Sequence, residues 1–120
     1  MSHIYAPYDE SLTADQNVER IIVTEITSTC PPQLLNQRNP FIHLMAVKNL
    51  LFTGKLGFTM QFSKGQVKIE KFLAMRELEA MLAADAEFNS KRVDAKDFAH
   101  YLMYTLLPTA DSCIYLAREN

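Results

Sequence analysis

The sequence predicts an α+β fold, in which a small, mainly antiparallel sheet carries helices packed on one face. Three observations predict this class: a β-branched segment near the start, an alternating hairpin in the middle and helical spacing in the second half. In chain order they give β-α-β-β-α-α-β. The 120 residues match the size of one domain, and 48% apolar with 22% charged residues is typical of a globular chain.

The start of the chain is polar, and the first predicted strand follows it. Residues 1–18 are expected to be an N-terminal arm or a short helix, and residues 19–120 a single domain. Thr13 and Gln16 have the spacing of a capping box. Residues 19–28, ERIIVTEITS, are rich in Ile, Val and Thr, whose branched side chains favour strands. We therefore expect a strand there, followed by a loop over residues 29–39.

The middle of the chain predicts a helix and then a hairpin. Asn39 can cap a helix whose first residue is Pro40, and the apolar residues that follow predict a helix buried on more than one side, ending at Gly54. Residues 56–62 and 67–73 each alternate apolar and polar side chains, and a turn with glycine joins them. This pattern predicts a β-hairpin with one face on the core.

The last part of the chain predicts two helices and a short strand. Residues 74–88 have helical spacing. A second helix is expected to begin at Asp94 and to end at Pro108, with Phe98, Leu102 and Leu106 on its buried face. Residues 113–117, CIYLA, predict a final strand that pairs with the first strand or with the hairpin.

The sequence contains no segment that we expect to direct the chain to a membrane. Residues 1–10 lack the basic cluster and apolar run of a signal peptide, and the longest mostly apolar stretch, residues 41–52, is too short to cross a bilayer. We therefore expect a cytoplasmic protein in which Cys30 and Cys113 are reduced thiols. A disulfide between Cys30 and Cys113 is possible only if the two ends of the fold meet.

No motif for catalysis or metal binding stands out in the sequence. His3, His43, His100 and the two cysteines are not at ligand spacing, and the three glycines do not form a phosphate-binding loop. The paired carboxylates of the two later helices have the positions of solvated faces. We therefore expect no enzymatic activity, no cofactor and no metal.

The leading hypothesis is that the chain binds another protein, as regulators, inhibitors and immunity-type proteins do. The last helix carries a surplus of aromatic and apolar residues away from its buried stripe, namely His100, Tyr101, Met103, Tyr104 and Leu107. Tyrosine and methionine are favoured at interfaces. The competing interpretation is that this helix is covered on both sides within the fold, and a homodimer is also open.

The second hypothesis is nucleic-acid binding by the basic hairpin. Residues 48–76 hold six basic residues against Glu70 alone, and basic side chains beside an aromatic ring suit phosphate contacts and base stacking. The candidates are Lys55, Lys64, Lys68, Lys71 and Phe72. The net charge of −2 argues against it, because nucleic-acid-binding domains are usually basic overall. A third hypothesis, a small-molecule pocket beside residues 30–39, has the least support because polar loops usually face water.

Overall fold

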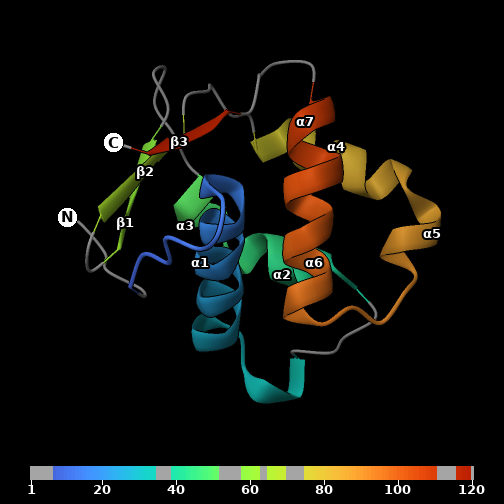
Figure 1. The fold of residues 1–120 in the computed structure, drawn as a ribbon. Helices are drawn as coiled ribbons and strands as arrows, with labels where there is room; N and C mark the ends of the chain where they lie inside the picture. The colour runs from blue at the N-terminus through green and yellow to red at the C-terminus, as the bar shows by residue number, and fades with distance from the viewer. Residues whose placement is uncertain are drawn as a thin grey trace.

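The computed structural model describes residues 7–34, 39–51, 58–62, 65–69, 75–110 and 116–119 (Figure 1). It confirms the α+β class: a three-stranded antiparallel sheet lies at one side of the molecule, and the helices lie on the other side of it. Helix α1 (Ala14–Thr29) is next to the sheet, and it also contacts α6 (Ala95–Tyr101).

The strand predicted for residues 19–28 is wrong, because these residues belong to helix α1. The capping box is formed: the Gln16 N–H donates to Thr13 Oγ1 at 3.1 Å, and the Thr13 N–H donates to Gln16 Oε1 at 2.9 Å. The buried apolar residues recur at intervals of three and four: Val18, Ile21, Ile22 and Ile26. Branched side chains lower helix propensity by only a few tenths of a kcal/mol each, and the burial of this stripe outweighs that cost.

The segment before α1 is fixed against the helix. The Asp9 N–H donates to Asn17 Oδ1, and Asn17 Nδ2 donates back to the Asp9 carbonyl, both at 3.1 Å. Tyr8 packs edge-on against Phe62, with 5.4 Å between the ring centroids. The expected boundary after residue 18 therefore falls inside α1, and residues 7–13 pack against the rest of the fold.

The helix expected after Asn39 is present as α2 (Phe41–Ala46) and α3 (Lys48–Leu51). Asn39 Oδ1 accepts a bond from the Phe41 N–H at 2.9 Å, as the predicted cap requires. The Val47 N–H still donates to the His43 carbonyl, and the Leu51 N–H donates to the Val47 carbonyl. The interruption is thus a local irregularity, and the predicted end at Gly54 lies outside the described residues.

The predicted hairpin is confirmed as β1 (Phe58–Phe62) and β2 (Gly65–Ile69). Its inward side chains, Met60, Phe62, Val67 and Ile69, are buried. The turn at residues 63–64 lies outside the described residues, as do residues 70–73 of the predicted second strand.

The final strand is β3 (Ala117–Glu119), which pairs antiparallel with β2. The prediction placed this strand at residues 113–117, of which residues 113–115 lie outside the described ranges. Pairing with the hairpin is confirmed, whereas pairing with residues 19–28 is excluded because they are helical.

The helix predicted for residues 74–88 is divided into α4 (Met75–Ala84) and α5 (Ala86–Asn89). Asp85 separates them, because its Oδ1 accepts from the Phe88 N–H at 3.0 Å and so caps α5. Asp85 is one of the paired carboxylates that were expected on solvated helix faces, and its capping role was not predicted.

The last helix begins as predicted and ends one residue later. Asp94 Oδ1 accepts from the Asp97 N–H at 2.7 Å and caps α6. The chain continues through the π-helical segment η2 (Leu102–Leu106) into α7 (Leu107–Thr109), which includes Pro108. Proline crowds the carbonyl four residues before it, and the wider turn, in which the Leu107 N–H bonds to the Leu102 carbonyl, relieves this crowding.

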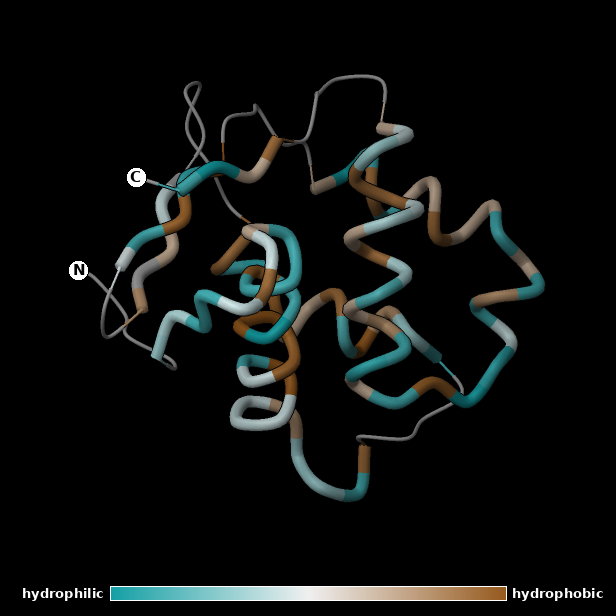
Figure 2. Tube along the Cα trace, in the orientation of Figure 1, coloured by the Kyte–Doolittle hydropathy of each residue, from teal (hydrophilic) through white to brown (hydrophobic). Residues whose placement is uncertain are grey.

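The buried core joins α1, the hairpin and the last helix. Figure 2 shows hydrophobic residues recurring between hydrophilic ones along α1. Within the described ranges, no helix has both the length and the apolar character needed to cross a bilayer.

The capping box provides a test of the helical assignment of α1. Thr13→Ala should lower the free energy of unfolding by about 1 kcal/mol, because the Gln16 N–H loses its acceptor. The matched control is Thr27→Ala, at an exposed threonine in the last turn of α1 whose hydroxyl donates to the Val23 carbonyl, and it should cost less because alanine has the higher helix propensity. Urea denaturation measures both, and equal losses would contradict the cap.

Candidate functional site

An open cleft of about 320 Å³ lies between α6 and the connection that leads into it from α5. Its volume is near the lower end for small-ligand sites, and it is large enough for one or two side chains. We call it the α5–α6 cleft. Its lining residues are Phe88, Lys91, Arg92, Val93, Asp97, His100, Tyr101 and Thr105.

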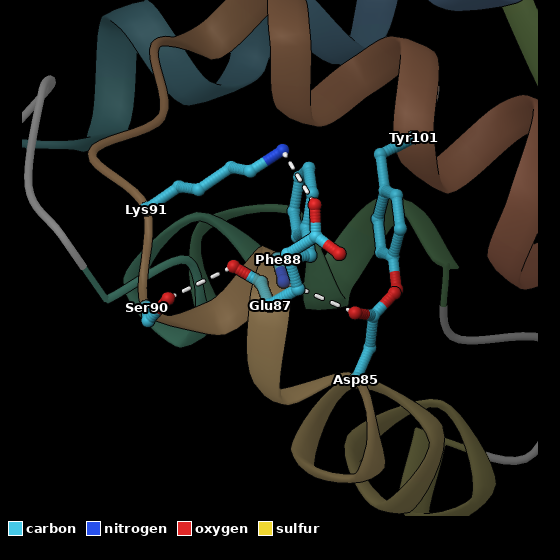
Figure 3. Close-up of polar contacts among 6 residues, drawn as sticks. All are labelled: Asp85, Glu87, Phe88, Ser90, Lys91 and Tyr101. Atoms are coloured by element: carbon cyan, nitrogen blue, oxygen red, sulfur yellow. Dashed lines mark hydrogen bonds and ion pairs between the residues drawn. The ribbon is translucent and has the colours of Figure 1, made fainter.

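Two stacked aromatic rings contribute the apolar surface of the cleft. The rings of Phe88 and Tyr101 are 3.6 Å apart and 7° from parallel. The Tyr101 hydroxyl donates to Asp85 Oδ2 at 2.7 Å, while Asp85 Oδ1 accepts from the Phe88 N–H. Figure 3 shows the Asp85 carboxylate directed toward both residues. One carboxylate therefore fixes both aromatic residues.

The same contacts set the ionisation of this group. The Phe88 N–H and then the Tyr101 hydroxyl lower the pKa of Asp85 below its ordinary value of 3.8. Burial, and then the neighbouring Asp85 carboxylate, raise the pKa of Tyr101. At neutral pH an ionised Asp85 therefore accepts from a protonated Tyr101.

The charged residues of the cleft have few strong partners. Lys91 Nζ is 3.8 Å from Glu87 Oε1, and both side chains are largely exposed, so this pair contributes little stability (Figure 3). His100 Nδ1 is 3.3 Å from Glu19 Oε2 on α1. The Arg92 side chain is exposed and forms no ion pair or hydrogen bond within the described ranges.

Tyr104 is next to the cleft, on η2. It is 42% exposed, and its ring is 4.6 Å from that of His100 at an angle of 46°. Partial burial, together with Glu19 and Asp15 on α1, raises the pKa of Tyr104. Tyr104 and His100 thus form a small aromatic surface beside α1, and we call these two residues with the α5–α6 cleft the α6 face.

The predicted partner-binding residues divide into three kinds. His100 and Tyr104 are exposed and adjacent, whereas Tyr101 is half-buried and bonded to Asp85. Met103 is only 1% exposed, so the expectation that it lies on an outward face is wrong. A signal for its burial was present, because Ala95, Ala99, Met103 and Leu107 recur every four residues beside the predicted stripe.

Sequence reasoning missed most of the cleft. No motif pointed to residues 89–92, and no spacing rule connects Asp85 with Tyr101. The local signal that was available is the pair of consecutive cations, Lys91 and Arg92, which are separated from the Asp94 cap by Val93 alone.

The described part of the predicted basic hairpin is small. Lys55, Lys64, Lys71 and Phe72 lie outside the described residues. Lys68 is partly buried in β2, and its neighbour across the sheet is Arg118 in β3. Nucleic-acid binding by the hairpin stays a prediction.

Unlike His100, His43 and Cys30 have structural surroundings. His43 is buried, with Nε2 2.8 Å from the Val93 carbonyl, so this nitrogen carries the proton. Cys30 is a buried free thiol, and burial raises its pKa, which makes it a poor nucleophile. No group of three metal-ligating side chains gathers within the described residues, and His3 and Cys113 lie outside them.

Comparisons with family models, with curated proteins and with solved structures found no match to this chain. The geometry of the α6 face is therefore the basis for assigning a function to this chain.

The bond between Tyr101 and Asp85 can be tested by Tyr101→Phe. We expect a lower free energy of unfolding at neutral pH, because an ionised Asp85 loses a donor. A lowered carboxyl pKa stabilises the fold above the unfolded value of 3.8 and ceases to do so as the pH falls through the folded pKa. The difference between variant and wild type should therefore shrink at acid pH, as the pH falls below 3.8 and through the folded pKa of Asp85.

The control for this test is Tyr104→Phe, which removes a hydroxyl that has no hydrogen bond to the described residues. Urea denaturation at both pH values should show little effect of the control. A loss in Tyr101→Phe that is independent of pH would contradict the role of the Asp85 carboxylate.

Proposed function

We propose that this chain is a non-enzymatic module that binds another protein through the α6 face, as a regulator, inhibitor or immunity-type protein does. The observation that carries the proposal is the exposed Tyr104, packed on His100 at the edge of an aromatic cleft.

The position of Tyr104 distinguishes it from the other exposed apolar residues. Among the described residues, the large hydrophobic side chains with high exposure are Met45, Tyr104 and Leu116. Single exposed apolar residues are common on protein surfaces and need no function. Tyr104 differs because its partner in the ring contact, His100, also lines the cleft.

The chemistry of the α6 face is that of binding hot spots. Tyrosine and arginine are enriched among the residues that dominate interface energies, especially near a pocket. The face contains Tyr104, Tyr101 and Arg92. A homodimer through this face is a special case of the same proposal, with a second copy as the partner.

The α6 face is also preorganised. Tyr101 is held by its hydrogen bond to Asp85 and by its stacking on Phe88. Helix α6, which carries Tyr101, is packed against α1. Side chains that are already fixed lose less conformational entropy when a partner binds. A fixed aromatic surface beside exposed cations is therefore suited to a partner with matching shape and charge.

A photocrosslinking experiment tests the proposal. Tyr104→p-benzoylphenylalanine should capture a discrete protein from a lysate of the native host, and the product should survive nuclease treatment. The matched control is Met45→p-benzoylphenylalanine, since Met45 on α2 is 49% exposed and is not one of the residues that form the α6 face. No capture, or equal capture at both positions, would contradict the α6 face as an interface.

With the captured protein purified, alanine variants give the energetic test of the same proposal. Tyr104→Ala should weaken binding about tenfold or more, and Met45→Ala should leave affinity unchanged.

A further inference from the structure

We propose that the α5–α6 cleft receives an acidic segment of the partner protein, with a carboxylate bound by Arg92 and Lys91. This inference depends on the proposed function and adds the chemistry of the partner. Four features of the cleft support this inference: its cations, its aromatic surface, its size and the acidic residues around it.

The cations of the cleft are available to an incoming anion. Arg92 has no charged partner within the described ranges, and its planar guanidinium can bind both oxygens of a carboxylate. Besides its electrostatic effect on Asp85, Lys91 is paired, among the described residues, with Glu87 at 3.8 Å on an exposed surface. Such a pair contributes little, so exchange of Glu87 for another carboxylate costs little.

The aromatic surface and the size of the cleft set what can accompany the carboxylate. Phe88 and Tyr101 form a fixed stacked pair, and the cleft holds about 320 Å³. The methylene groups of a glutamate, or an apolar neighbour, can pack against these rings while the carboxylate contacts the cations. Thr105 and Asp97 add a hydroxyl and an acceptor for the main chain of the segment.

The acids around the cleft favour a short acidic peptide over a nucleic acid. Asp97 lines the cleft, Glu19 contacts His100, and Glu87 is paired with Lys91. Asp97 lines the cleft and the other two carboxylates contact lining residues, so an extended polyanion that follows this surface meets three like charges. A short peptide can place one or two carboxylates on Arg92 and Lys91 without running along these acidic side chains.

The test selects random displayed peptides of about twelve residues on the immobilised full chain. The selected peptides should be rich in Asp and Glu near an aromatic or aliphatic residue. Binding, measured by fluorescence anisotropy, should weaken tenfold or more in Arg92→Glu and should weaken as salt is raised. The matched control is Lys96→Glu, an exposed cation on α6 that does not line the cleft, and it should change affinity less than twofold.

Three results would overturn the inference. The first is that no peptide is selected or that the selected peptides are not acidic. The second is an equal loss in Lys96→Glu and Arg92→Glu, which would indicate a general charge effect. The third is a short single-stranded oligonucleotide that displaces the peptides and binds more tightly.

These outcomes are separable from failure of the proposed function. If crosslinking at Tyr104 still captures a protein while acidic peptides fail, protein binding stands and the acidic specificity is lost. Circular dichroism of Arg92→Glu and Lys96→Glu confirms that both variants are folded, and both positions are exposed.

Discussion

Helix α1 has to be covered on two sides, and most of the architecture depends on this constraint. Ile21 and Ile22 are adjacent in the sequence and both fully buried, although neighbouring residues on a helix point about 100° apart. The sheet covers one side of α1 and α6 the other. The inner face of α6 is thereby used for packing, and His100 on its outer face and Tyr104 on the adjoining η2 remain exposed beside Glu19.

A second dependence connects the break between α4 and α5 with the candidate site. Asp85 caps α5 with one carboxylate oxygen and holds the Tyr101 hydroxyl with the other. The first bond orients Phe88 and the second fixes Tyr101, so the stacked rings of the α5–α6 cleft follow from a helix cap. The connection after α5 then carries Lys91 and Arg92 to the cleft. The site is therefore a consequence of local helix chemistry that two distant segments share.

The sequence was sufficient for the hairpin and for the caps at Thr13, Asn39 and Asp94, because these depend on alternation or on short spacing. The strand predicted for residues 19–28 is wrong because the abundance of branched residues was given more weight than their helical spacing. The sequence left open whether the outer residues of the last helix are exposed or covered; His100 and Tyr104 are exposed, while Met103 and Leu107 belong to the core. The Asp85–Tyr101 bond joins residues far apart in the chain, so no local pattern predicts it.

Amide hydrogen exchange along α1 tests the central claim most directly. If α1 is the helix that both layers cover, the amides of residues 21–26 should exchange only through global unfolding. Their exchange free energies should then equal the free energy of unfolding measured with urea. Exchange of these amides at clearly lower free energy than those of β2 would contradict the account, because it would show α1 opening while the rest of the fold persists.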